Sequence, residues 1–144
     1  IHYNFLDTDT FIEQKTGKSI NQIFSESGED FFRKLEENFI SKILSQENYV
    51  FSLGGGVMSS LKLRKLIKKN SFNIYLEVNN KILIKRLQTS KKRPLIKNTN
   101  IENKLKDLMS KRESFYKKAD LIIKNDQKVS DAINELKKIF KIYD

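Results

Sequence analysis

Short apolar runs alternate with helical periods along this chain, and this alternation constrains the fold more than any other feature of the sequence. The runs are rich in β-branched and aromatic residues, and between them apolar residues recur at spacings of three and four. The strand-like runs lie at 3–6, 49–53, 72–78 and 121–123. This order is typical of an α/β fold in which a parallel sheet carries helices on both faces. Ligands of such sheets bind beyond the carboxyl ends of the strands, so the loops after the strands are where chemistry is expected.

The same periodicity predicts the helices and some of their ends. Gly17 is expected to end a short helix, and Ser19 is expected to cap the next one. The predicted helices cover 10–15, 19–25, 28–46, 60–69, 80–87, 101–118 and 129–142.

The composition excludes several classes of protein. The 144 residues suffice for one domain, which we expect over 1–144. The absence of cysteine excludes a disulfide scaffold, a zinc-thiolate site and a cysteine nucleophile, and the single histidine, His2, excludes a Ser–His–Asp triad. No apolar run approaches the length of a membrane span and no secretory signal is recognisable, so we expect a cytoplasmic protein with no membrane partner.

The net charge of +10 is concentrated in the middle of the chain. Residues 62–118 hold 18 basic and 4 acidic residues, whereas residues 1–61 hold 5 basic and 9 acidic ones. Such a field attracts phosphates, whether on nucleotides, nucleic acids or membranes. A lysine-rich composition that reflects a coding bias explains the charge equally well.

Two carboxylates, Asp7 and Asp9, follow the first strand-like run with one residue between them. At a strand end, one of them can hold a hydrated Mg²⁺ while the other accepts a proton from an alcohol. Taken alone, the pattern favours a solvated turn in which Asp9 caps the following helix.

Three consecutive glycines, Gly54, Gly55 and Gly56, follow the second run, although the chain has only 5 glycines. They expose backbone N–H groups and allow a ligand to approach closely; a flexible strand exit is the alternative. On the predicted helix 28–46, Arg33 and Glu36 are neighbours. Glu36 either orients Arg33 toward an anion or forms only a surface ion pair with it.

Two further arginines stand in different settings. Arg93 and Pro94 lie in the aperiodic segment 91–99, which is either a cationic lid over a transferring phosphate or an exposed basic loop. Arg112, on the predicted helix 101–118, is either a solvated charge or a fork for a carboxylate.

Together and in this order, these elements resemble the shikimate kinase family. The resemblance runs from about residue 5 to residue 123, and the shared order and spacing of the motifs make it specific. The motifs are Phe5-Leu6-Asp7-Thr8-Asp9, Gly17-Lys18-Ser19-Ile20, Phe32-Arg33-x-x-Glu36, Leu53-Gly54-Gly55-Gly56, Arg93-Pro94-Leu95 and Lys111-Arg112-x-x-x-Tyr116. The resemblance implies a P-loop kinase-like fold of the nucleoside monophosphate kinase type, with a substrate-binding part at about 8–56 and a lid at about 89–99.

The resemblance also implies a reaction and a role for each candidate residue. ATP would phosphorylate the 3-hydroxyl of shikimate to give shikimate 3-phosphate, a transferase step of aromatic amino-acid biosynthesis on the way to chorismate. Asp9 would bind the hydroxyl and act as its base, and Asp7 would hold Mg²⁺ through water. The other implied contacts are Arg33, Arg112, Glu36, Gly54, Gly55 and Gly56 in the shikimate pocket, Arg93 at the ATP phosphates, and Pro94 and Arg86 near the adenine. The partners would be shikimate and ATP, with no nucleic acid, and the protein would be a monomer.

One element of the family does not occur in the chain. Gly17-Lys18-Ser19 is no phosphate loop of the pattern G-x-x-x-x-G-K-[ST], because Ile12 stands where the first glycine belongs and a predicted helix comes before it. The resemblance therefore implies that the phosphate loop and a central first strand precede Ile1. We expect the chain alone to show negligible kinase activity, either as an excerpt of an intact enzyme or as a truncated homologue.

Three other functions stay open. A nucleic-acid-binding module is supported by the charge of 62–118, but no interleaved aromatic residues or recognition motif accompany it. A non-catalytic truncated homologue would keep the substrate pocket. A kinase for another substrate, such as a nucleotide or gluconate, fits the paired arginines and the triple glycine less well than a kinase for a small carboxylate.

Overall fold

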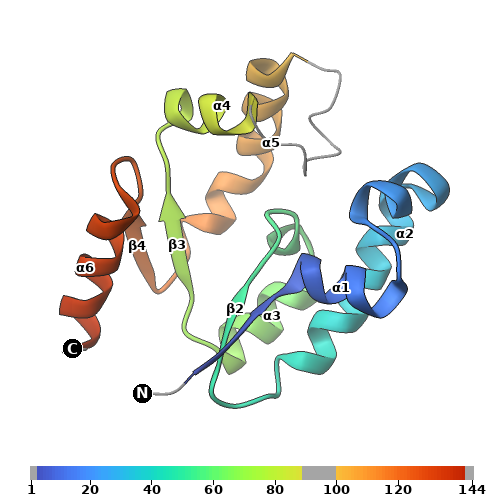
Figure 1. The fold of residues 1–144 in the computed structure, drawn as a ribbon, viewed down its shortest axis with the longest axis horizontal. Coiled ribbons are helices and arrows are strands. Elements are labelled where there is room, and N and C mark those ends of the chain that lie inside the picture. The colour runs from blue at the N-terminus through green and yellow to red at the C-terminus, as the bar shows by residue number, and fades with distance from the viewer. Residues whose placement is uncertain (1–2, 89–99, 142–144) are drawn as a thin grey trace. The chain divides into compact units, whose positions relative to one another are not determined.

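A computed structural model describes residues 3–88 and 100–141 of the chain (Figure 1). These residues fall into two compact units, the first ending at Ser71 and the second beginning at Phe72. The predicted single domain over 1–144 stays a prediction. The first unit contains β1 (Asn4–Asp7), α1 (Thr8–Thr16), α2 (Ile20–Ile43), β2 (Tyr49–Ser52), the 3₁₀ helix η1 (Val57–Ser59) and α3 (Leu61–Asn70). The second contains β3 (Ile74–Glu77), α4 (Asn80–Gln88), α5 (Ile101–Tyr116), β4 (Leu121–Lys124) and α6 (Val129–Phe140).

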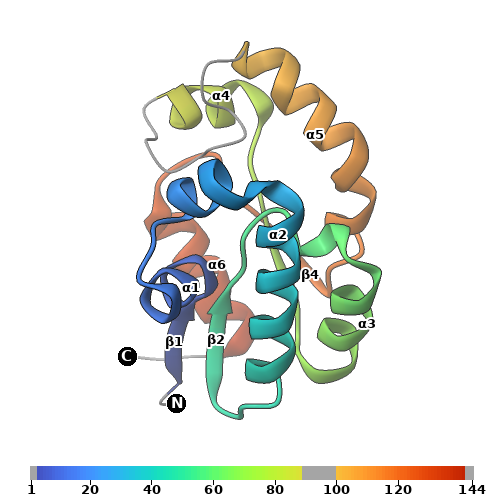
Figure 2. The same ribbon diagram turned by 90° about the vertical axis from the view of Figure 1, so that its right-hand side faces the viewer.

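The first unit is organised around the parallel pair β1 and β2, which lie side by side in Figure 2. The register places Asn4 opposite Tyr49 and Asp7 opposite Ser52. Because both strands end at the same edge, the segment that begins with Asp7 and the glycine segment Gly54–Gly56 leave the sheet together. The predicted strands and their parallel pairing are confirmed.

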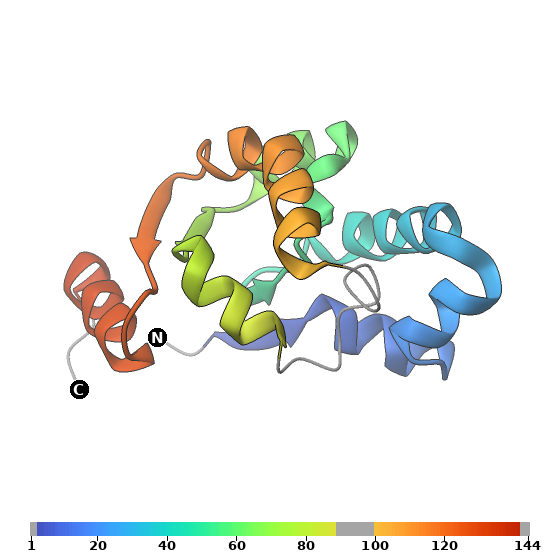
Figure 3. The same cartoon turned by 90° about the horizontal axis from the view of Figure 1, so that it is seen from above.

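The helices of the first unit begin and end at residues that satisfy their free backbone groups. Gly17, with φ of 67°, ends α1, and Ser19 caps α2 in a reciprocal pair of hydrogen bonds with Gln22. The predicted break between two helices near Gly28 is confirmed, because α2 consists of two helical parts that meet at a kink at this residue. Gly28 takes φ of 81° and ψ of 172°, a conformation that essentially only glycine adopts, and the helix changes direction there (Figure 3).

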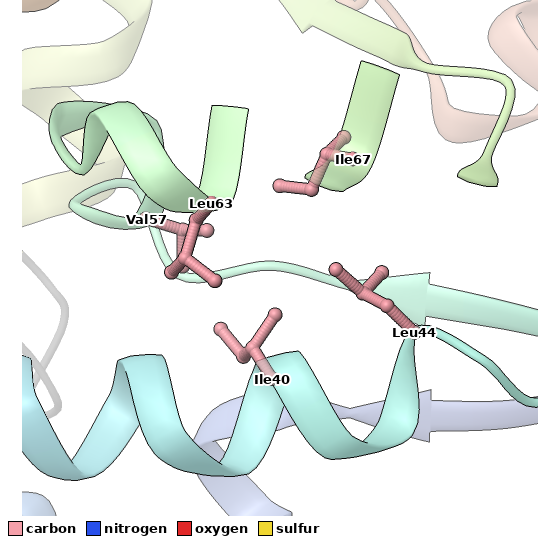
Figure 4. Close-up of a cluster of buried hydrophobic side chains, with 5 residues drawn as sticks. All are labelled: Ile40, Leu44, Val57, Leu63 and Ile67. Carbon is pink, nitrogen blue, oxygen red and sulfur yellow. The ribbon is translucent and has the colours of Figure 1, made fainter. Parts of the chain in front are cut away.

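The buried core of the first unit joins α2 to the segment that follows β2. Ile40 of α2 and Leu44, which caps the end of this helix, pack against Val57 of η1 and against Leu63 and Ile67 of α3 (Figure 4). A second buried cluster, formed by Ile12, Ile23 and Phe32, joins α1 to both parts of α2. These contacts hold α1, η1 and α3 against α2.

The second unit repeats the parallel pairing with β3 and β4, in which Ile74 lies opposite Leu121. Among the described residues, each strand pair forms its own two-stranded sheet. Tyr75 of β3 stacks on Tyr116 at the end of α5, with ring centroids 5.2 Å apart. The strands and helices predicted for this part are confirmed, although α5 ends at Tyr116 instead of 118. No helix in the described part of the chain is long and apolar enough to cross a membrane.

Candidate active site

Asp7 and Asp9 take different places at the end of β1. The Oδ1 of Asp7 accepts a hydrogen bond from the backbone N–H of Thr10 at 2.9 Å and so caps α1. The expectation that Asp9 is the helix cap is therefore wrong, because α1 begins at Thr8, two residues before the predicted start, and the residue that precedes it is Asp7. Burial alone would raise the pKa of Asp7, but hydrogen bonds from Thr10 and Ser52 outweigh it and hold this pKa below its usual value.

Thr8, between the two aspartates, is a residue that sequence reasoning missed. Its side chain is only 1% exposed, and its hydroxyl donates to the backbone carbonyl of Ser52 at 3.0 Å. This hydrogen bond ties the start of α1 to the end of β2, and so holds Asp9 close to the glycine segment. The position of Thr8 between two candidate acids could have drawn attention to it. Nothing in the sequence, however, indicates that its side chain is buried.

The glycine segment lies against the acidic and basic side chains of the site. A Cβ atom at Gly54 would lie 3.0 Å from Oδ1 of Asp9 and 3.2 Å from Oε1 of Glu36, which is tighter than ordinary packing. A Cβ atom at Gly56 would overlap the guanidinium of Arg33. A larger residue at either position would therefore displace these side chains, and Asp9, Arg33 and Glu36 gather around one short segment.

Arg33 is held by two acids on its own helix. Its Nη1 donates to Oε2 of Glu36 at 2.7 Å, and its Nη2 lies 3.3 Å from Oε1 of Glu29. Glu36 is 2% exposed, whereas the side chain of Glu29 is 44% exposed, so the two pairs differ in environment. The expected Arg33–Glu36 contact is present, and its burial excludes a mere surface ion pair.

The remaining candidates belong to the second unit or fall outside the described residues. Arg112 is partly buried on α5, and its predicted approach to the same ligand as Arg33 stays a prediction. The Nη2 of Arg86 donates to the backbone carbonyl of Asn125 at 3.0 Å, which links α4 to the loop after β4. Arg93, Pro94 and the predicted lid 89–99 lie outside the described residues.

Asp7 is the carboxylate that the family resemblance predicts to hold magnesium. Within 3–88 and 100–141, no three histidine, aspartate or glutamate side chains gather as a cation cage. Mg²⁺ in phosphoryl-transfer sites keeps several waters and needs only one or two carboxylates. Asp7, whose lowered pKa keeps it charged, fits such a water-mediated role at the strand end.

Comparisons with known proteins agree with this arrangement. The profile of the family described as shikimate kinase matches residues 1–141. The chain belongs to the shikimate kinase family. It is 41% identical over 143 residues to the shikimate kinase of Chlorobaculum tepidum, covering 93% of this chain and 75% of that protein. The shikimate kinase of Chlorobaculum parvum is 39% identical over 143 residues, with 93% of this chain and 76% of that protein covered.

Solved structures of shikimate kinases share the fold. The enzyme from Acinetobacter baumannii, solved in complex with shikimate, gives a TM-score of 0.89 at 32% identity and covers 96% of this chain and 79% of its own. The shikimate kinase from Aquifex aeolicus gives a TM-score of 0.82 at 29% identity, covering 96% of this chain and 82% of its own. The predicted α/β fold of the P-loop kinase type, the enzyme class and the use of ATP as co-substrate are confirmed.

Proposed function

We propose that Asp9, Arg33 and Gly54–Gly56 form the shikimate pocket of this shikimate kinase family member, which transfers the γ-phosphoryl group of ATP to the 3-hydroxyl of shikimate. The observation that carries the proposal is the gathering of a carboxylate and a guanidinium around one glycine segment at the end of a parallel strand pair. The related enzyme from Acinetobacter baumannii was solved in complex with shikimate, which supports the choice of substrate.

The carboxylate of shikimate would be bound by Arg33. Hydrogen bonds to Glu36 and Glu29 engage three of the N–H groups of Arg33, out of the five that a guanidinium has. The bonds to Glu29 are longer, at 3.3 and 3.4 Å, and this acid is exposed, so an incoming carboxylate can displace it while buried Glu36 keeps the guanidinium in place. Arg112 would supply the second guanidinium from α5, and Glu36 would act through Arg33.

The hydroxyl of shikimate would meet Asp9. As the hydroxyl oxygen forms its bond to the γ-phosphorus, Asp9 accepts the hydroxyl proton, and the bond between the γ-phosphorus and the bridging oxygen breaks to release ADP. Asp7 would hold Mg²⁺ through water, and the ion would neutralise charge on the phosphates. Arg93 would reach the phosphates from the lid, and Arg86 and Pro94 would contact the adenine. Such a transfer depends mainly on positioning and electrostatics, so the chain needs no covalent nucleophile.

Calorimetric titration with shikimate tests the pocket in the full-length protein. We expect Arg33→Ala and Arg112→Ala each to weaken binding by about 10- to 100-fold, since each removes a charged hydrogen-bond donor from a carboxylate. Lys34→Ala, an exposed neighbour on α2, should leave the affinity unchanged. Asp9→Asn should keep most of the affinity but lower kcat by at least about 100-fold. Equal affinities of the wild type and both arginine variants would contradict the proposed pocket.

We also propose that Mg²⁺ is required and that the protein acts as a cytoplasmic monomer without a nucleic-acid or membrane partner. The oxygen-only chemistry at Asp7 supports the metal, because hard cations such as Mg²⁺ prefer oxygen ligands. Removal of divalent cations with a chelator should abolish turnover, and added Mg²⁺ should restore it. Sedimentation should give the mass of one chain, and nucleic-acid binding in a filter assay should stay negligible at physiological salt.

A further inference from the structure

We propose that Arg64, on α3, is a positioning residue for the shikimate pocket, because it holds the glycine segment Gly54–Gly56 from its far end. The inference rests on the proposed function, since it concerns the same pocket. Arg64 is not in the set of residues expected to touch shikimate or ATP, and it would act through the backbone between β2 and α3.

The hydrogen bonds of Arg64 point backward along the chain. Its Nη1 donates to the backbone carbonyl of Met58 at 2.6 Å and to that of Ser59 at 3.1 Å. These carbonyls lie at the end of η1, where a short helix leaves its last carbonyl groups without partners in the helix. One charged nitrogen therefore closes the end of η1 and fixes it to the first turn of α3.

The glycine segment is joined directly to η1. The backbone N–H of Val57 donates to the carbonyl of Gly54 at 3.1 Å, and that of Ser59 donates to the carbonyl of Gly56 at 2.9 Å. Val57 is fully buried and packs against α2 and α3 (Figure 4). A displacement of η1 would therefore move both Gly54 and Gly56, whose positions set the space for the side chains of the pocket.

The glycine segment also lies beside the side chains proposed to bind shikimate. Gly54 faces Asp9 and Glu36, and Gly56 lies beneath the guanidinium of Arg33. Because a Cβ atom at Gly54 or Gly56 would crowd these side chains, the position of this backbone sets the space that they occupy. The structure thus connects Arg64 to the proposed carboxylate site through one continuous stretch of backbone.

A second set of contacts joins the start of α3 to α2. The hydroxyl of Ser60 donates to Oε2 of Glu37 at 2.7 Å while it caps α3 by accepting from the N–H of Leu63. Lys62 also contacts Glu37, at 3.1 Å. This tie holds the start of α3 to the helix that carries Arg33 and Glu36. We therefore expect the unit to stay folded without Arg64, with the loss confined to the order of η1 and the glycine segment.

The test compares Arg64→Met with Lys68→Met in the full-length protein. Lys68 is exposed on the same helix, so its variant removes the same charge without touching η1. Arg64→Lys is the rescue variant, because a single ammonium can donate to both carbonyls as Nη1 does. The measurements are the KM values for shikimate and ATP, and the hydrogen exchange rates of the Val57 and Ser59 amides in the ligand-free protein.

We expect Arg64→Met to raise the KM for shikimate by about 5- to 20-fold, to leave the KM for ATP within about 2-fold, and to speed exchange at Val57 and Ser59 by at least about 10-fold. Arg64→Lys should recover most of both effects, and Lys68→Met should show neither. Unchanged exchange at these amides would overturn the inference whatever the substrate is. Faster exchange with an unchanged shikimate KM, in a wild type that phosphorylates shikimate, would also overturn it. A wild type that does not bind shikimate would instead refute the proposed function. In that case the exchange rates of the Val57 and Ser59 amides in Arg64→Met would still show whether Arg64 holds the segment.

Discussion

Replacing Gly56 with alanine isolates the contact between the glycine segment and Arg33. Gly56 has φ of −85° and ψ of −18°, a backbone conformation that alanine adopts without strain. The added methyl group would overlap the guanidinium of Arg33. The substitution therefore acts on the position of one side chain and hardly on the backbone.

The size of the effect follows from the overlap. Carbon atoms in contact need a separation of about 3.5–4.0 Å, so the guanidinium must retreat by more than about 1 Å. A misplacement of about 1 Å in a binding group costs up to about 100-fold. A charged hydrogen bond lost entirely costs about 1.5–3 kcal/mol, which corresponds to about 10- to 150-fold. We therefore expect the KM for shikimate to rise by about 10- to 100-fold. The melting temperature should change little, because the guanidinium is the end of a flexible side chain.

Steady-state kinetics in a double-mutant cycle provides the assay. Gly56→Ala, Arg33→Ala and the double variant are compared for both substrates, with the KM for ATP as the internal control. If alanine at position 56 acts by displacing the guanidinium, it should cost nothing further once Arg33 is gone. The reasoning is refuted if Gly56→Ala leaves the KM for shikimate unchanged, or raises it by the same factor with and without Arg33.

Three further outcomes follow from the described contacts. Glu36→Gln should lower the unfolding free energy by about 1–3 kcal/mol in urea titrations and raise the KM for shikimate, because a buried charged partner of Arg33 is lost; an unaltered KM would contradict it. Gly28→Ala should lower the unfolding free energy by about 1–3 kcal/mol, since φ of 81° with ψ of 172° strains a Cβ; equal urea midpoints would show that the helix relaxes. Asp7 has a lowered folded pKa, so its carboxylate stabilises the fold above its unfolded value of 3.8 and this stabilisation is lost as the pH falls through the folded pKa. The urea midpoints of the wild type and Asp7→Asn should therefore converge below about pH 4, and a gap that stays constant down to pH about 2 would argue against it.

The order of strands and helices could be predicted because it depends on local apolar spacing. The run at 49–53 became β2, and the period over 101–118 became α5. The parallel pairing followed from a general rule of alternating elements. The ends of elements were less certain: α1 begins at Thr8, directly after β1, so its cap is Asp7 and not the expected Asp9.

Features that depend on a single backbone conformation were not predictable. A glycine in a helical pattern predicts a boundary, and the kink of α2 does lie at Gly28, but the positive φ that produces the kink was not predicted. The 3₁₀ helix Val57–Ser59 is too short to produce a periodic signal.

In the candidate site, too, contacts between residues close in sequence could be predicted, whereas contacts between distant residues could not. The pairing of Arg33 with Glu36 follows from their spacing of three on a helix, and this spacing can be read directly from the sequence. The closeness of Gly54 to Asp9, and of Gly56 to Arg33, joins residues that are distant in sequence. Only folding brings these together, so the sequence could suggest the residue types of the site but not the contacts that require glycine.

The consecutive acids Glu36 and Glu37 make the length of α2 matter more than its composition. The first faces Arg33 and the glycine segment, and the second holds the start of α3. Each added residue turns a helix by about 100°. A single insertion between Arg33 and Glu36 would turn the arginine by that angle relative to both acids, whereas exchanges on the outer face of the same stretch would not. Variation among homologues in this stretch should therefore be rich in substitutions and almost free of insertions and deletions.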